Sequence, residues 1–81
     1  MLFPGDFVFV DITADKLDLT YMPGVCLGNN VRSSTVPQLA RGIVIATTSS
    51  ECGPEALVLF SGFRLGWNAQ ACFKLVSARK S

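Results

Sequence analysis

The sequence predicts a small all-β domain, a five-stranded barrel with a long loop after its first strand. Its 81 residues are the length of one domain, so we expect residues 1–81 to fold as a single unit. Short runs of β-branched and aromatic residues are separated by glycine, proline and asparagine turn signals. No amphipathic helix of useful length interrupts these runs.

The first half of the chain has one clear strand, at residues 7–12, after the Pro4-Gly5 turn. This strand is apolar at both parities, so both of its faces are expected to be covered. Residues 13 to about 40 are predicted to be the long loop. Within the loop we expect one helical turn at 16–19, a turn at 21–24 and a short strand at 25–27.

The second half is more regular. Strands are predicted at 42–48, 56–60, 65–68 and 72–76. They are joined by a hairpin connection at 49–55, a tight turn at 61–64 and a 3₁₀ turn at 69–71. Gly62 is expected to take a positive φ in the tight turn. Short strands that close on themselves in this way hide the edges of the sheet.

The composition favours contacts with other chains. Apolar residues make up 49% of the chain and charged residues only 16%, against about 25% charged in typical domains. A small barrel cannot bury all of this apolar surface, so part of it is expected to face outward. The net charge of +1, with scattered basic residues, leaves no footprint for nucleic acid. No targeting segment or membrane span is predicted.

Neither catalysis nor metal or cofactor binding is expected. The chain has no histidine to activate a serine or cysteine. Asp11, Asp15 and Asp18 are the only acidic cluster, and they lack the glycine and terminal glutamate of a calcium loop. We interpret them as solvated loop charges and caps.

The three cysteines Cys26, Cys52 and Cys72 form no CxxC pair, so no zinc site is predicted. Their number is odd, and the apolar sequence around Cys26 and Cys72 is typical of buried reduced thiols. Reduced thiols favour a cytoplasmic location. If the protein is phage-encoded, the virion is the alternative location.

Three short motifs carry a resemblance to a known superfamily. They are residues 5–8 (GDFV), 41–44 (RGIV) and 66–73 (GWNAQACF). Together with the predicted strand order, they resemble SH3-like barrels, in particular small bacterial and phage-encoded proteins of this kind. The resemblance implies a five-stranded barrel with a 3₁₀ turn before the closing strand.

The resemblance does not extend to polyproline binding. Ala69 stands where eukaryotic SH3 domains have a proline, and Cys72 where they have a groove tyrosine. Two other barrel relatives remain as alternatives. The KOW type shares the G-D-x-V opening and brings basic surface to nucleic acid. The type II dihydrofolate reductases are oligomeric pore enzymes, whose active-site run this chain lacks.

The candidate contact residues are Tyr21, Phe63, Arg64 and Trp67. Tyr21 lies in the long loop and Phe63 in a tight turn, where an aromatic side chain has little core to enter. Trp67 is expected at the barrel mouth with its ring partly covered, and Leu65 inside. Trp, Tyr and Arg are also the residues that dominate binding interfaces. The sequence therefore predicts a non-enzymatic protein-interaction or assembly module, whose partner is another protein or a second copy of itself.

Overall fold

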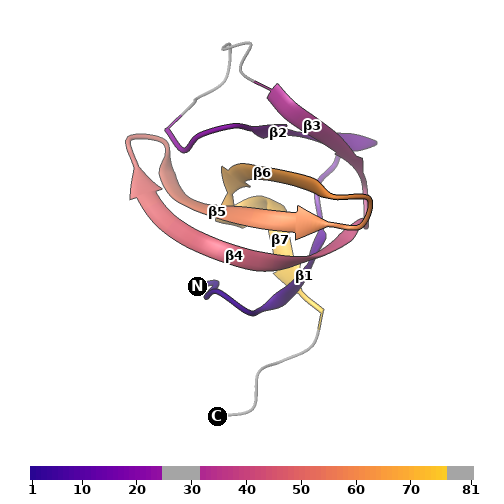
Figure 1. The fold of residues 1–81 in the computed structure, drawn as a ribbon, viewed down its shortest axis with the longest axis horizontal. Helices are drawn as coiled ribbons and strands as arrows, with labels where there is room; N and C mark the ends of the chain where they lie inside the picture. Colours follow the sequence, from indigo (N-terminus) through magenta and orange to yellow (C-terminus); the bar gives the residue numbers. More distant parts are fainter. Residues whose placement is uncertain (25–31, 77–81) are drawn as a thin grey trace.

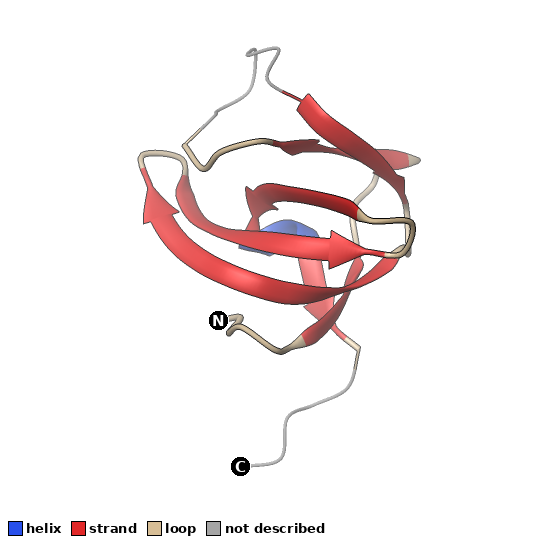
Figure 2. Ribbon diagram, viewed as in Figure 1, coloured by secondary structure: helices blue, strands red, loops and turns tan. Residues whose placement is uncertain are grey.

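A computed structural model of the chain describes residues 1–24 and 32–76. The elements within these residues are β1 (Phe7–Val10), β2 (Lys16–Thr20), β3 (Arg32–Pro37), β4 (Arg41–Ser50), β5 (Gly53–Phe60), β6 (Arg64–Ala69), η1 (Gln70–Cys72) and β7 (Phe73–Leu75). The seven strands form one antiparallel sheet, ordered β3-β2-β6-β5-β4-β1-β7, which curls into a half-barrel (Figure 1). Figure 2 shows that strands dominate the structure and that the helical turn η1 lies behind them.

The all-β class is confirmed, but the expectation of five strands is wrong. The two additional strands, β2 and β3, pair with each other inside the region predicted as a loop at about 13–40. Residues 16–19, predicted as a helical turn, belong to β2. Leu17 and Leu19 are buried there, and their neighbours Lys16 and Asp18 are exposed, which is the two-residue period of a strand. The strand predicted at 25–27 lies outside the described residues.

The first strand is shorter than predicted, and one of its faces is fully covered while the other is covered only in part. Val8 and Val10 are fully buried, whereas Phe7 is 66% exposed. Pairing with β4 on one side and β7 on the other fixes this orientation. The prediction that both faces of this strand are covered is therefore wrong at Phe7.

Strands β4, β5 and β6 form a meander that makes up most of the sheet. The β4–β5 hairpin turns on only two residues, Glu51 and Cys52, because Ser50 pairs directly with Gly53. The connection predicted at 49–55 is thus mostly strand. A bulge between Val44 and Ala46 lets the long β4 bend.

The core lies inside the curl of the sheet. It is built from alternate residues of every strand except β6, together with Leu2 from the N-terminal segment. Phe60 and Phe73 meet there, with ring centroids 6.2 Å apart. Among the described residues, no helix is long and apolar enough to cross a membrane. The buried apolar side chains are Leu2, Val8, Val10, Leu17, Leu19, Val36, Val44, Ala56, Val58, Phe60 and Phe73.

Candidate binding surface

Three of the four predicted contact residues line one hollow, of about 510 Å³. Tyr21 directly follows β2, Phe63 lies in the β5–β6 turn, and Arg64 is the first residue of β6. The hollow exists because β6 pairs with β2 only at Trp67 and Thr20, so the two elements separate towards the β5–β6 turn. Ser33 bridges part of this gap by donating its hydroxyl hydrogen to the Leu65 carbonyl, at 2.9 Å.

Among the described residues, Phe63 is the most exposed large apolar residue, at 94%. It ends a three-residue loop between the paired residues Phe60 and Arg64. Gly62 takes the predicted positive φ, at 77°, but Phe63 also has a positive φ, at 59°. For a residue with a bulky side chain the left-handed region is unfavourable, and glycine or asparagine fits it better. Phe63 is therefore held in a strained conformation while its ring contacts solvent.

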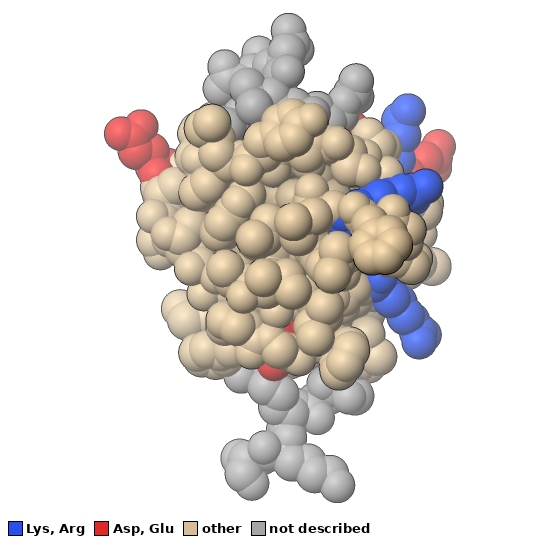
Figure 3. Space-filling model, viewed as in Figure 1, with Lys and Arg blue, Asp and Glu red and all other residues tan. Residues whose placement is uncertain are grey.

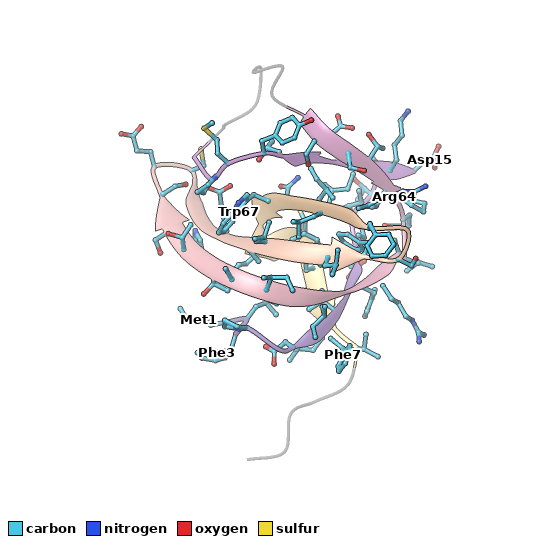
Figure 4. All side chains as sticks on the ribbon, in the orientation of Figure 1. Met1, Phe3, Phe7, Asp15, Arg64 and Trp67 are labelled. Atoms are coloured by element: carbon cyan, nitrogen blue, oxygen red, sulfur yellow. The ribbon has the colours of Figure 1, made fainter. Side chains whose placement is uncertain are left out.

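Arg64 is exposed at the start of β6 and forms no ion pair within the described part of the chain. Figure 4 shows it beside the β5–β6 turn, at the opposite end of β6 from Trp67. Arg41 begins β4 at the same end of the meander, because Gly42 pairs with Phe60. The turn that carries Phe63 is thus flanked by two exposed cations.

Trp67 does not line this hollow. It is half-buried in β6, between Leu57 of β5 and Thr20 of β2. Its partial burial matches the expectation for the ring, but Leu65, expected inside the barrel, is 44% exposed. Leu65 and Trp67 both face outward because Gly66, between them, points to the inner face, where an added Cβ would meet the buried Leu19.

An apolar face across four strands was missed by the sequence analysis. Phe7 of β1 pairs with Ile43 of β4, Ile43 with Leu59 of β5, and Leu59 with Leu65 of β6. Directly paired residues of an antiparallel sheet point to the same face. Phe7 and Leu65 are exposed, and Ile43 and Leu59 are partly exposed, so this row lies on the outside of the sheet.

A second row lies parallel to the first. Ala46 of β4 pairs with Leu57 of β5, and Leu57 pairs with Trp67 of β6. All three are half-buried. We call the two rows together the outer apolar face; its residues are Phe7, Ile43, Leu59, Leu65, Ala46, Leu57 and Trp67.

The outer apolar face is continuous with two hollows. Leu57 and Leu65 help to line the hollow that holds Phe63. Phe7, Ile43 and Leu59 help to line a second hollow, of about 400 Å³, in which Arg41 is the only charged residue. The paired residues Leu59 and Leu65 therefore form a ridge between two concave regions.

Charged side chains surround this face but do not enter it. Figure 3 shows a broad uncharged surface in front of β4, β5 and β6, with Lys and Arg at the edge near the β5–β6 turn. The turn at the other end of the meander carries the exposed Glu51. The two ends of the face thus differ in the sign of their charge.

The acidic residues singled out in the sequence are dispersed in the structure. Asp11, Asp15 and Asp18 are exposed, and within residues 1–24 and 32–76 no three metal-ligating side chains lie together. Asp18 accepts a hydrogen bond from the Thr35 hydroxyl at 3.0 Å. The buried Glu55 accepts from the Gly24 N–H at 2.7 Å and from the Ser50 hydroxyl at 2.5 Å, which assigns it a structural role.

The cysteines depart in part from the expectation of reduced thiols. Cys72 is free and half-buried, and its thiol donates to Asn68 Oδ1 at 3.6 Å. Burial raises the pKa of this thiol above its ordinary value. Cys52, in contrast, is disulfide-bonded. Its partner is not Cys72, and Cys26 lies outside the described residues.

The chain was compared with protein families, curated proteins and solved structures. No family model matches it, and neither does any curated protein or solved structure at a significant level. The geometry of the surface is therefore the basis for the function proposed below.

Proposed function

We propose that this chain is a non-enzymatic protein-interaction or assembly module built on an SH3-like barrel. The strand pairing supports the barrel. Strand β1 pairs with both β4 and β7, β4 to β6 form a meander, and a 3₁₀ turn precedes the last strand. In this proposal β2 and β3 form a hairpin inserted between the first strand and the meander.

The outer apolar face is the observation that carries the functional part of the proposal. Exposed apolar side chains scattered singly are normal, but contiguous rows across four strands mark a surface that another molecule covers. Phe63, an exposed ring in a strained conformation next to Arg64, has the features of an interface anchor. The seven residues of the outer apolar face are all aliphatic or aromatic, which suits contact with another apolar surface.

Photo-crosslinking from the surface tests the interaction role. A benzophenone amino acid replaces Phe63 in one variant and Leu39 in another, in the full chain expressed in its native host. Leu39 is the matched control because it is also exposed and also has a positive φ, of 68°, but it lines neither hollow. We expect a protein adduct from position 63 and none from position 39. Absence of any adduct at 63, or equal adducts at both, contradicts the proposal.

Polyproline binding is not part of this proposal. Ala69 and Cys72 occupy the two ends of the 3₁₀ turn region, where a proline and an aromatic ring would be needed. We expect a proline-rich peptide to leave the spectrum of Trp67 unchanged, even at millimolar concentration.

One observation favours a nucleic-acid role as the second candidate. Tyr21, Phe63 and Arg64 line one hollow, and aromatic rings beside cations are typical of single-strand binding. Anisotropy of labelled single-stranded RNA and DNA at low salt tests this candidate. Salt-dependent binding that Phe63→Asn and Arg64→Glu abolish would favour it over the protein-interaction role. We expect no binding, because the net charge is only +1.

The location is also a proposal. The two expected locations were the cytoplasm and, for a phage-encoded protein, the virion. Disulfides persist in oxidising surroundings, so the disulfide at Cys52 favours the virion, which leaves the cell, over the reducing cytoplasm. Thiol titration of the denatured protein from its native source tests this, because all three cysteines would react if it were fully reduced.

A further inference from the structure

We propose that the partner of the outer apolar face is a second copy of this chain, packed face to face in an antiparallel dimer related by a two-fold axis. This inference rests on the proposed function and names its partner. Two sheets packed through their apolar faces are a common way to bury such surfaces. Closed two-fold dimers are also the commonest homo-oligomers.

The absence of charge on the face is the first argument for a second copy. None of its seven residues is charged. In Figure 3 the surface in front of β4, β5 and β6 carries no charged side chain, and away from the edges of the view acidic atoms are visible only below it. A copy of the same face therefore brings no like-charge repulsion and leaves no charge buried without a partner. A partner with a charged docking surface would lose hydration here without gaining an opposite charge.

The charges at the ends of the face select the orientation. Arg64 begins β6 after the β5–β6 turn, and Arg41 begins β4 at the same end of the meander. Glu51 lies in the β4–β5 turn, at the other end. A two-fold axis perpendicular to the strands and in the plane of the interface places the Arg end of one copy over the Glu51 end of the other. A two-fold axis along the strands would instead place the Arg ends together. The face is thus complementary to itself in the antiparallel orientation.

The strain at Phe63 points to the same surface. Phe63 has a φ of 59°, and its ring is 94% exposed. Within a single copy of the chain, glycine or asparagine would adopt this backbone conformation at a lower cost in free energy. Strained residues persist where the strain serves a contact. In the dimer the ring projects from the edge of one face and covers apolar surface on the second copy.

The area that such a dimer needs is a modest share of the surface. A stable interface buries about 800 Å² on each partner, which is about one seventh of the 5332 Å² surface of the chain. Figure 3 looks down the shortest axis of the molecule, so the uncharged face is on one of its two broad sides. The two hollows, of about 510 and 400 Å³, flank the Leu59–Leu65 ridge and give the second copy concave regions to fill.

Sedimentation velocity of the full chain between about 1 and 200 µM tests the dimer. We expect a concentration-dependent dimer for the natural sequence and at least a tenfold weaker association for Phe63→Asn. Asparagine accepts the left-handed conformation, so this variant is expected to melt at the same or a higher temperature. Leu65→Ser provides a second variant at an exposed position. Leu39→Asn, the same kind of substitution outside the face, is expected to associate like the natural chain.

A charge exchange tests the orientation. Arg64→Glu and Glu51→Lys are each expected to weaken the dimer several-fold, and the double variant is expected to regain most of the lost affinity. If the double variant is weaker than either single variant, the antiparallel arrangement is overturned. The loss in each single variant should also shrink at high salt, because the residues lie at the rim.

The failure of this inference is distinguishable from failure of the proposed function. A chain that stays monomeric at 200 µM, or one that Phe63→Asn and Leu39→Asn weaken equally, overturns the dimer. If position 63 then crosslinks to a different protein, the interaction role stands and the partner is another chain. An adduct with twice the mass of the chain supports the dimer directly.

Discussion

The side-chain amide of Gln38 pairs with both backbone polar groups of Ile12. Gln38 Oε1 accepts a hydrogen bond from the Ile12 N–H at 3.0 Å, and Gln38 Nε2 donates to the Ile12 carbonyl. The Gln38 N–H also donates to the Asp15 carbonyl, at 2.8 Å. Ile12 follows the end of β1, and the Gln38 side chain supplies the hydrogen bonds that a neighbouring strand would otherwise make to it. Gln38 thereby joins the segment after β1 to the β3–β4 turn.

Gln38→Ala is expected to lower the free energy of unfolding by about 1–3 kcal/mol, because two partly buried backbone groups of Ile12 lose their partners. Gln38→Glu should also destabilise at neutral pH, since a carboxylate accepts from the N–H but repels the carbonyl. Urea unfolding with an unchanged m-value measures both effects. A loss below about 0.3 kcal/mol for Gln38→Ala would mean that other contacts close this end of the sheet.

The second half of the fold was predictable because its strands carry their own signal. Residues 42–48 and 56–60 are rich in β-branched and apolar side chains, and both lie within observed strands. The ends were missed because backbone pairing extends β4 through Ser49-Ser50 and starts β5 at Gly53, where the side chains carry no strand signal. Backbone hydrogen bonds across a two-residue turn do not require apolar residues.

The β2–β3 hairpin was not predicted, although its pattern is present. Leu17 and Leu19 alternate with Lys16 and Asp18, but five residues with a preceding aspartate also resemble a capped helical turn. The alternatives differ in a long-range contact: Leu17 pairs with Val36, nineteen positions later. A local pattern does not contain that pairing.

The candidate surface was predictable where exposure follows from a turn. Tyr21 and Phe63 are exposed because their segments contain no core positions, and sequence reasoning identified both. The outer apolar face was missed because residues 56–60 are apolar at every position. Only the register with β4 and β6 decides that Leu57 and Leu59 face outward.

Gly66 lies where no larger residue fits. A Cβ there would be 2.5 Å from Ser33 Oγ and 3.2 Å from the Thr20 carbonyl oxygen, and would overlap Leu19 Cβ. Gly66→Ala is therefore expected to push β2 away from β6 and to cost about 2–3 kcal/mol of stability, as overpacking does.

Gly5→Ala is the comparison for Gly66→Ala. Gly5 has a φ of 96° but no atom within 4 Å of an added Cβ, so its cost is conformational and about 1 kcal/mol. Thermal and urea unfolding of both variants measure the difference. Equal costs at the two positions would contradict the close packing of β2 on β6.

Glu55 joins the turn at Gly24 to the β4–β5 hairpin. It is 3% exposed, and its Oε2 accepts from the Gly24 N–H and the Ser50 hydroxyl. Glu55→Ala is expected to cost about 2–4 kcal/mol, because hydrogen bonds to a carboxylate contribute about 1.5–3 kcal/mol each.

A double-mutant cycle with Ser50→Ala measures the coupling between Glu55 and Ser50. Their bond is 2.5 Å long, so the two losses should not add. Glu55→Gln keeps one acceptor oxygen and should cost less than Glu55→Ala. Additive losses in the cycle would show that the two side chains act independently.

The thiol of Cys72 should react slowly in the folded protein. Burial raises its pKa above the ordinary value of 9.0, and the thiolate is the reactive form. Alkylation by iodoacetamide is therefore expected to rise at a higher pH in the folded chain than in the urea-unfolded chain. Peptide mapping by mass spectrometry follows Cys72 separately, and coincident pH profiles would contradict its burial.

The same pKa shift has a consequence for stability. The folded chain holds the Cys72 proton more tightly than the unfolded chain. The contribution of this group to the free energy of unfolding therefore has its full value below about pH 9. It is expected to fall as the pH rises through the unfolded and then the folded pKa. Cys72→Ser should remove this alkaline loss, and an identical alkaline profile in the variant would contradict the assignment to Cys72.

Trp67 reports on the outer apolar face because it is the only tryptophan in the chain and is half-buried in the second row of that face. If a second copy covers the face, Trp67 emission should shift to shorter wavelength as the concentration rises, and Phe63→Asn should remove the shift. Trp67→Ala is expected to weaken association by more than about 1 kcal/mol, as interface anchors do. It should cost the fold only about 1–2 kcal/mol, less than the ~3–5 kcal/mol of a fully buried aromatic residue. A variant that no longer folds would place Trp67 in the core and remove it from the contact surface.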